Sequence, residues 1–450
     1  MFPLFPLLVL LLLTFSGCGA AKHSASSLAE PFEAEPIIRV LILEEVPKIE
    51  FIPLNGYQLI TSDGYSDLPV DATVTLERIP GGMLRVSVPG QKPQDSEWFR
   101  IVPVAGQSFP EVRIPNVPYG QGWWWANEED RFYTGIMAFH PHGEEGINAI
   151  VHLPVEEYLR GVVPSEIGRE APTEALKAQA VAARSETVVS LRKGAYKGPE
   201  YDICSTVQCQ VYAGTRRSNE AVDAAILATR GEVLSHQGKP VAAYYASNSG
   251  GHTEHIENVW SARAALRQIW RGNPDTLEPI SQDLTNHEQF AAWVRSAPPA
   301  YANRATFPEL PEWTQKNYRW ERIITVKEFS EQIAKKQNIG TVQQLIPGTR
   351  GISGRLMEIE LVGESGRLTV KDQLEIRRMI APPLRSSAFI VETGKNEAGE
   401  LTFIFIGAGY GHGVGMCQTG AMGRALSGQT YRQILAHYYR ETEVVSAYGN

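Results

Sequence analysis

The residue best suited to acid–base chemistry in this sequence is Glu166, which follows Pro164 and Ser165 between an apolar stretch and a long helical pattern. Apolar neighbours such as Val162 and Ile167 would desolvate a carboxylate here and raise its pKa, as a general acid requires. We therefore expect Glu166 to lie in a short turn and treat it as a candidate acid. The alternative is that it only starts a helical turn.

A glycine-rich segment near the C-terminus is the second candidate for chemistry. Residues 407–423, GAGYGHGVGMCQTGAMG, hold seven glycines in seventeen positions. The segment contains neither G-x-G-x-x-G nor a GK[ST] ending, so it does not predict nucleotide binding. Dense glycine lets the backbone approach a ligand closely, and His412 and Gln418 would supply directed hydrogen bonds. A flexible turn without a ligand is the alternative.

The cysteines leave several possibilities open. Cys204 and Cys209 form a C-x4-C pair without a nearby His or further Cys to complete four zinc ligands. A short-loop disulfide, a metal site and two free thiols remain alternatives, and an oxidising compartment favours the disulfide. Cys417 near His412 suggests a Cys-His hydrolase. We do not favour it, because no helix start and no orienting Asn or Asp follows the cysteine.

Three consecutive tryptophans, Trp123, Trp124 and Trp125, stand in a strand-rich region. Alternation along a strand would place Trp123 and Trp125 on one face. Paired rings of this kind can stack on sugars, although burial in a core is their commoner use.

Composition limits the class of protein that must position these residues. The 450 residues are 43% apolar and 20% charged, which is ordinary for a folded globular chain. With 42 basic and 50 acidic side chains, the formal net charge is −8. That balance argues against a general binder of nucleic acid or anionic membranes, because such proteins need surplus Lys and Arg.

The N-terminus predicts export. Residues 1–17 form the only long apolar run, too short for a comfortable spanning helix of about 20 residues and similar to a secretory signal. Ser16, Gly17 and Cys18 resemble a bacterial lipoprotein box, in which the cysteine is lipidated. We predict a membrane-anchored protein of the cell envelope, with residues 19–36 as a polar tether. A plain cleaved signal is the alternative.

The remaining chain predicts an α+β fold dominated by β-structure. Alternating apolar and polar residues indicate strands over residues 37–155, while 3- and 4-residue apolar spacing indicates a long helix over 173–193. On that helix Arg184 lies off the apolar stripe. The further elements expected are helices over 219–229 and 430–439, a loop-rich insertion over 262–320, and strands over 355–363, 388–393 and 401–409.

Six ordered blocks of this sequence resemble the SpoIID/LytB family of cell-wall proteins. They are VEEYLRGVVPSEIG, EALKAQAVAARSE, YDICSTVQCQVYAG, YYASNSGGHTE with NVW, SGRL with IRR, and GYGHGVGMCQTGAMGRALSGQTYRQILAHYY. The resemblance runs from about residue 37 to the C-terminus. It implies a β-rich SpoIID-like fold with one long central helix and short peripheral helices.

The resemblance also implies an activity. It is that of a lytic transglycosylase acting on MurNAc-GlcNAc strands of peptidoglycan, typically after removal of their stem peptides, with Glu166 as acid and base. A non-catalytic glycan-binding protein that stimulates a cell-wall amidase is the alternative role attached to the family. Residues at family positions lining the cleft are Tyr201, Gln210, Ser249, Gly250, Gly251, His412 and Gln418.

No cofactor is required for this chemistry, but some family members bind zinc through two cysteines and a histidine. Here Cys204 and Cys209 match, whereas no histidine precedes them and Gln208 occupies the frequent histidine position. The residues around this pair therefore do not complete the zinc ligand set of those members. Cys417 replaces the usual serine of its block. The division expected for the chain is a signal over 1–18, a tether over 19–36, and one SpoIID-like domain over 37–450 that comprises a β-rich lobe (37–150), a catalytic core (151–261), an insertion (262–320) and a C-terminal part (321–450).

Overall fold

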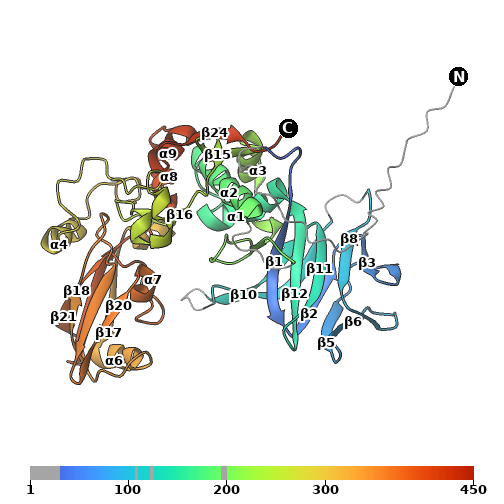
Figure 1. The fold of residues 1–450 in the computed structure, drawn as a ribbon, viewed down its shortest axis with the longest axis horizontal. Coiled ribbons are helices and arrows are strands. Elements are labelled where there is room, and N and C mark those ends of the chain that lie inside the picture. Colours follow the sequence, from blue (N-terminus) through green and yellow to red (C-terminus); the bar gives the residue numbers. More distant parts are fainter. Residues whose placement is uncertain (1–30, 107–109, 122–125, 194–199, 450) are drawn as a thin grey trace.

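The computed structural model describes residues 31–106, 110–121, 126–193 and 200–449. The predicted signal, Cys18 and the three consecutive tryptophans lie outside these residues. The described chain is a mixture of strands and helices, so the predicted α+β class is confirmed. Figure 1 shows a β-rich region at one end, a group of helices in the middle and a second β-containing region at the other end.

One mixed sheet and one antiparallel sheet build the N-terminal β region. One has seven strands in the order β13-β1-β12-β11-β8-β3-β4, and the other has six in the order β10-β9-β2-β5-β6-β7. Their bounds are β1 Ile37–Val46, β2 Lys48–Pro53, β3 Tyr57–Thr61, β4 Gly64–Asp67, β5 Val74–Ile79, β6 Met83–Ser87, β7 Gln94–Ser96, β8 Phe99–Pro103, β9 Val112–Tyr119, β10 Asn127–Tyr133, β11 Ile136–His142, β12 Gly146–Pro154 and β13 Ile203–Cys204.

The strands follow the alternation expected from the sequence. In β6 and in the first half of β2, buried and less buried residues alternate, as on sheets with one face toward a core. The central strand β12 is buried on both faces and pairs with β1 and β11. The predicted strands over residues 37–155 are thus confirmed, and β12 delivers the chain directly into the first helix.

Three helices follow: α1 Val155–Ile167, α2 Thr173–Lys193 and α3 Glu220–Ala228. The last two match the predicted helices, and the Asn219 side chain caps α3 by accepting a hydrogen bond from the Val222 N–H. Helix α1 was not predicted, because Pro164 reads as a break. In the structure Pro164 lies inside α1, in its last turn.

Helix α2 corrects one expectation about charge. From Leu176 onward it is buried on nearly all sides, and Arg184, expected on the polar face, is fully buried. The Arg184 guanidinium pairs with the Glu156 carboxylate of α1, with Nη2 at 2.7 Å from Oε2 and Nε at 2.9 Å from Oε1. The apolar spacing of α2 did not predict this burial, because the charge of Arg184 is balanced by a carboxylate on another helix.

The C-terminal residues return to the same helical group. They form β23 Met416–Cys417, α8 Gln418–Leu426, α9 Tyr431–Tyr438 and the edge strand β24 Glu443–Ser446. The two strands pair with earlier ones, β23 with β16 and β24 with β14. The bounds of the earlier strands are β14 Glu232–His236, β15 Lys239–Pro240 and β16 Tyr245–Ala246. Helix α9 matches a predicted helix, and β16 pairs with β23 in parallel.

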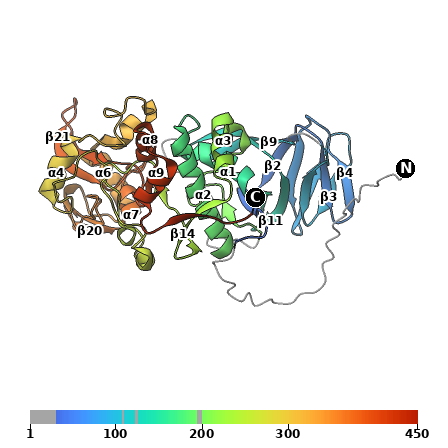
Figure 2. The same cartoon turned by 90° about the horizontal axis from the view of Figure 1, so that it is seen from above.

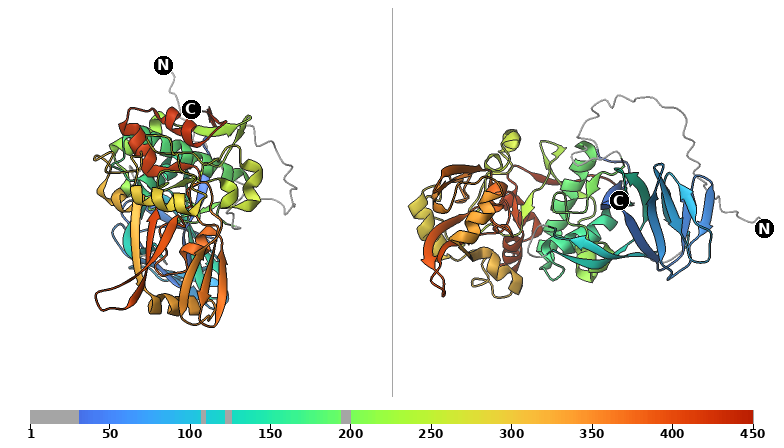
Figure 3. Two further views of the ribbon diagram at one scale, coloured as in Figure 1. Left: turned by 90° about the vertical axis from the view of Figure 1, so that its left-hand side faces the viewer. Right: turned by 90° about the horizontal axis from the view of Figure 1, so that it is seen from below.

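The region between these segments has a hydrophobic core of its own, which runs from Trp320 to Phe405. Two three-stranded antiparallel sheets, β17-β22-β21 and β18-β19-β20, surround it with helices α6 and α7. Figures 2 and 3 show this module at the end of the molecule opposite β1–β12, with the helices between. The bounds are α4 His287–Ser296, α5 Gln315–Tyr318, β17 Arg319–Thr325, α6 Val326–Ala334, β18 Val342–Pro347, β19 Glu358–Gly363, β20 Gly366–Lys371, α7 Gln373–Arg377, β21 Phe389–Lys395 and β22 Leu401–Ala408.

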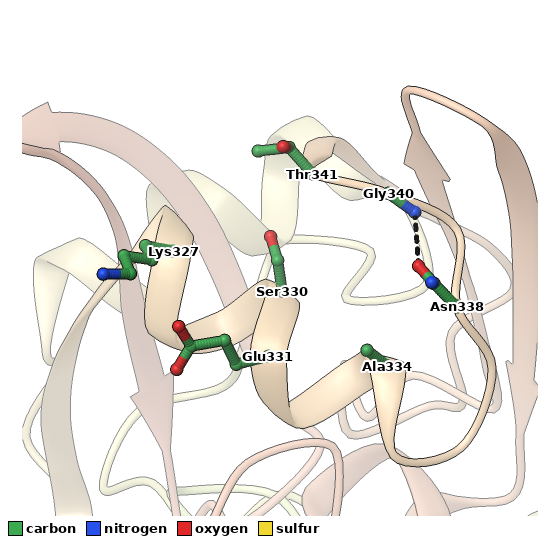
Figure 4. Close-up of a pocket in the computed structure, with 7 residues that line it drawn as sticks. All are labelled: Lys327, Ser330, Glu331, Ala334, Asn338, Gly340 and Thr341. Carbon is green, nitrogen blue, oxygen red and sulfur yellow. Dashed lines mark hydrogen bonds between the residues drawn. The ribbon is translucent and has the colours of Figure 1, made fainter.

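The strands predicted near residues 355–363, 388–393 and 401–409 correspond to β19, β21 and β22. An open hollow of about 340 Å³ lies beside α6 in this module, lined by Lys327, Ser330, Glu331, Ala334, Asn338, Gly340 and Thr341 (Figure 4). Over the described ranges, no helix has the length and apolar character needed to cross a membrane.

Candidate active site

Glu166 lies in the last turn of α1, one residue before its end. The predicted turn is therefore wrong in detail, because the helix continues through Pro164 to Ile167. It ends at Gly168, whose φ of 88° suits glycine and stops the helix. The carboxylate thus projects from a fixed helical position instead of a loop.

The Glu166 carboxylate is half-buried and held at both oxygens. The Val211 N–H donates to Oε1 at 2.8 Å, and the Gln418 Nε2 donates to Oε2 at 3.3 Å. Burial among apolar residues raises the pKa of Glu166 to about 7, against the lowering effect of these two hydrogen bonds. The carboxyl group is consequently able to carry a proton near neutral pH and to give it up.

Gly161, one and a half turns earlier in α1, explains how Val211 reaches Glu166. A Cβ at this position would lie 2.4 Å from the Tyr212 ring and 2.7 Å from the Gly214 carbonyl oxygen. Only glycine lets the segment containing Val211 and Tyr212 lie directly against the helix. The hydrogen bond from the Val211 N–H to Glu166 therefore depends on the absence of a side chain at Gly161 in the same helix.

Gln418 comes from the glycine-rich segment and contacts two elements at once. Its Nε2 group donates to Glu166 and also to the Gln179 Oε1 atom of α2, at 3.3 Å. Both glutamines are buried. The first residue of α8 is thereby placed between α1 and α2.

Gln210 is a buried hub next to this cluster. Its Oε1 atom accepts hydrogen bonds from the hydroxyl groups of Tyr158 and Thr187, while its Nε2 donates to the Ala183 carbonyl and the Tyr245 hydroxyl. Burial and the Glu166 charge both raise the pKa values of Tyr158 and Tyr245 well above 10. These tyrosines are therefore neutral neighbours of the carboxyl group.

A second carboxylate, Glu186 of α2, belongs to the same surroundings. Its charge also raises the pKa of Tyr158 and Tyr245, and its side chain is 7% exposed. Glu186 follows Gln179 by seven residues, which places both on one face of α2. Glu166 therefore has a second carboxylate in its surroundings.

Ser249, Gly250 and Gly251 form a segment that contacts Cys417, the residue before Gln418. The Ser249 hydroxyl donates to the buried Asp275 carboxylate at 3.2 Å, and its N–H donates to the Cys417 sulfur at 3.0 Å. A Cβ on Gly250 would lie 2.8 Å from the Gly409 backbone nitrogen. At this position the absence of a side chain allows two chain segments of the protein to touch.

His412 is neutral and contacts an aromatic group. Its Nδ1 accepts a hydrogen bond from the Val414 N–H at 3.0 Å, and its ring centroid lies 4.9 Å from that of Trp260. Burial and the charges of Arg355 and Arg377 lower the pKa of His412 to about 3. Tyr201 has Glu44 of β1 as its charged neighbour, and neither described hydrogen bond of the Glu166 carboxylate involves it.

Cys204 and Cys209 are joined by a disulfide bond. Their sulfurs are therefore not the thiolates that zinc requires, and among the described residues no group of three or more His, Cys, Asp or Glu side chains could hold a metal. The donor set does not fit zinc. The disulfide closes the segment directly before Gln210 and Val211.

Cys417 corrects a second expectation. A helix does begin after it, and its sulfur caps α8 by accepting a hydrogen bond from the Gly420 N–H at 3.2 Å. Burial nevertheless raises the pKa of the Cys417 thiol to about 12, so it is not an activated nucleophile. The Cys-His hydrolase hypothesis gains no support.

The structure thus brings Glu166, Gln418 and the neighbours of Gln210 together. Sequence reasoning missed Gln179, Tyr158, Tyr245 and Glu186. A signal existed for Gln179, a polar residue inside an otherwise small and apolar helical stretch. The Val211 contribution comes from the backbone and has no sequence signal.

Comparisons with known proteins match two separate parts of the chain. The family model described as stage II sporulation protein, SpoIID, matches residues 143–236, which include α1, α2 and Val211. A second model, described as a domain of unknown function, matches residues 259–415. Glu166 therefore lies in the part matched by the first model, and the module with the core from Trp320 to Phe405 lies in the part matched by the second.

Relatives cover most of the chain. A protein of Brachyspira hyodysenteriae described as uncharacterized is 30% identical over 70% of this chain and 72% of its own length. The amidase enhancer of Bacillus subtilis is 30% identical over 64% of this chain, but only 40% of its own length is covered. Stage II sporulation protein D of Bacillus amyloliquefaciens is 27% identical over 67% of this chain and 76% of its own length. The chain therefore belongs to the SpoIID/LytB family, whose members take part in cell-wall remodelling.

Proposed function

We propose that this protein is a peptidoglycan lytic transglycosylase in which Glu166 is both general acid and general base. The observation that carries the proposal is a half-buried carboxyl group whose pKa is raised to about 7 and whose two oxygens are held by separate elements. A glycosidase acid needs such a raised pKa in order to remain protonated near neutrality.

The proposed reaction has two proton transfers at one carboxyl group. Protonated Glu166 gives its proton to the oxygen between MurNAc and GlcNAc as the bond from C1 to that oxygen breaks. The resulting carboxylate takes the proton of the MurNAc C6 hydroxyl, whose oxygen bonds to C1 and closes the 1,6-anhydro ring. No water is consumed, and the acid is regenerated.

The hydrogen bonds to Glu166 suit this alternation. The Val211 N–H and the Gln418 Nε2 both favour the carboxylate form, and burial favours the protonated form. With neither form strongly favoured, each transfer costs little. The substrate proposed is the glycan strand with its stem peptides removed, as the family resemblance implies.

The direct test is mass spectrometry of products from peptide-free glycan strands, with the wild type and Glu166→Gln compared. We expect 1,6-anhydro-terminated fragments from the wild type and a loss of at least a thousandfold in the variant. Reducing-end products would instead mean hydrolysis and would turn attention to Glu186 as a second carboxylate. Absence of any product from the wild type would refute the proposal.

A second candidate is a glycan-binding protein that stimulates a cell-wall amidase. It is favoured by one observation, the relative named amidase enhancer. In that case Glu166→Gln would keep full stimulation of a purified N-acetylmuramoyl-L-alanine amidase. Loss of stimulation in the variant would exclude this role as independent of catalysis.

For location, we propose export to the cell envelope with lipidation at Cys18. Within the predicted polar tether over residues 19–36, the Phe32 N–H donates a hydrogen bond to the Ala447 carbonyl of the C-terminal segment. The proposed anchor is tested by labelling cells with a fatty acid and comparing Cys18→Ala with the wild type. Unchanged membrane association of the variant would rule the anchor out.

A further inference from the structure

A group of half-buried aromatic side chains adjoins the Glu166 cluster. The Trp260 ring centroid lies 5.1 Å from that of Tyr244 and 4.9 Å from that of His412. Trp260 and Tyr244 both retain solvent exposure, unlike Trp270, which is buried beneath Tyr244. Half-buried aromatic rings on a buried aromatic base are suited to contact with the apolar face of a ligand.

Arg263 lies over these rings. Its guanidinium carbon is 4.9 Å from the Tyr244 ring centroid and 5.0 Å from that of Trp260. Within the part of the chain that the structure describes, this guanidinium is half-buried and has no acidic partner. A guanidinium stacked on rings keeps the N–H donors of its edge available, and these match the two oxygens of a carboxylate.

The position of this group relative to Glu166 follows from the short parallel pair β16–β23. Tyr244 directly precedes Tyr245, whose hydroxyl accepts a hydrogen bond from the Gln210 hub. The paired strand β23 runs directly into Gln418, the hydrogen-bond donor to Glu166. The Trp260 group and the Glu166 cluster are thus connected through the backbone of β16 and β23, which makes the group a candidate contact for a polymer that extends beyond Glu166.

We propose that Trp260, Tyr244 and Arg263 form a subsite for a sugar that carries a free carboxylate, here a muramyl residue whose lactyl group bears no peptide. This inference rests on the proposed function. The rings would take the apolar face of the sugar, and the Arg263 fork would take the carboxylate. A stem peptide converts that carboxylate into a neutral amide, so the subsite distinguishes bare strands from peptide-bearing strands by charge.

Binding, not turnover, tests this subsite. Soluble peptide-free muroglycan fragments and the same fragments with their carboxyl groups methyl-esterified are titrated into Glu166→Gln protein, which leaves them uncleaved. We expect Arg263→Gln to weaken binding of the carboxylate form tenfold to a hundredfold, as for hydrogen bonds between charged groups. Affinity for the ester should not change. Arg263→Lys keeps the charge without the fork and should lose affinity to an intermediate degree.

Arg267→Gln is the matched control, because it removes an exposed arginine only four positions away. Its affinity should equal that of the parent, and thermal unfolding curves show whether each variant is folded. Equal weakening of acid and ester by Arg263→Gln would overturn the proposal, as would competition by free stem peptide. Since these readouts require no cleavage, a failure of the transglycosylase proposal would be seen separately, in the product analysis of the wild type.

Discussion

At the scale of single residues, the opposed influences on Glu166 determine how the protein should respond to pH. Its pKa is raised to about 7 in the fold, whereas a glutamate in an unfolded chain titrates near 4.3. The folded protein therefore holds a proton that the unfolded chain releases. The resulting stabilisation is complete below about pH 4 and is lost as the pH rises through 7.

We predict that Glu166→Gln gains stability relative to the wild type as the pH rises from 4 to 8. The gain should be at most about 3 kcal/mol, since the carboxyl group is partly exposed. Denaturant unfolding at several pH values measures it, with Glu170→Gln, at an exposed glutamate, as the control. A difference in stability that does not change with pH would show that Glu166 is not desolvated in the fold.

Turnover by the wild type should correspondingly fall about tenfold per pH unit above 7, because the protonated form of Glu166 is the general acid.

Residue types alone identified Glu166 and Gln418 but not how they meet. The two are 252 positions apart in the chain, and their contact exists only because α1 and α8 pack beside α2. Local spacing carries no information on such a contact. Apolar neighbours did predict the direction of the Glu166 pKa shift, because they lie beside the carboxyl group and contribute to its desolvation.

At the scale of elements, the approach of the Val211 segment to α1 makes Gly161 the most sensitive glycine near the site. We predict that Gly161→Ala displaces Tyr212, breaks the Val211 hydrogen bond to Glu166 and lowers activity at least tenfold. Overpacking of this kind should also cost about 1–3 kcal/mol of stability. The amount of anhydro-terminated fragments released from glycan strands measures the activity, and thermal unfolding measures the stability.

Gly366→Ala supplies the comparison, because the added Cβ would lie no closer than 3.6 Å to any atom and is in the distant module. It should leave activity unchanged. Full activity of Gly161→Ala would mean that the Val211 segment does not need to approach the helix so closely.

The elements also show why pattern reasoning failed in part. Helix α2 was found because its length and its Ala-rich sequence override local ambiguity, but its burial on nearly all sides removed the polar face on which Arg184 was expected. Helix α8 was missed because its first residues belong to a glycine-rich segment. There Cys417 provides a cap that cysteine rarely offers, where serine is preferred.

At the scale of the whole molecule, both ends of the described chain are fastened to the helices that carry the site. The Phe32 N–H donates to the Ala447 carbonyl at 2.7 Å, and the Glu35 carboxylate accepts a hydrogen bond from the Glu156 N–H at 2.8 Å. The Tyr448 hydroxyl donates to the Glu156 carboxylate, which also holds Arg184. The two ends therefore stabilise the same contact between α1 and α2.

We predict that removal of residues 443–450 costs about 3–5 kcal/mol, because it deletes β24, the partner of β14, and leaves the buried Glu156–Arg184 pair without one of its donors. Activity should fall in parallel with stability, since Glu166 itself is untouched. Tyr448→Phe removes only the hydroxyl and should cost about 1–3 kcal/mol, with the product spectrum unchanged. Activity lost at full stability would instead place the C-terminal strand in the site, because only a direct role could then account for the loss.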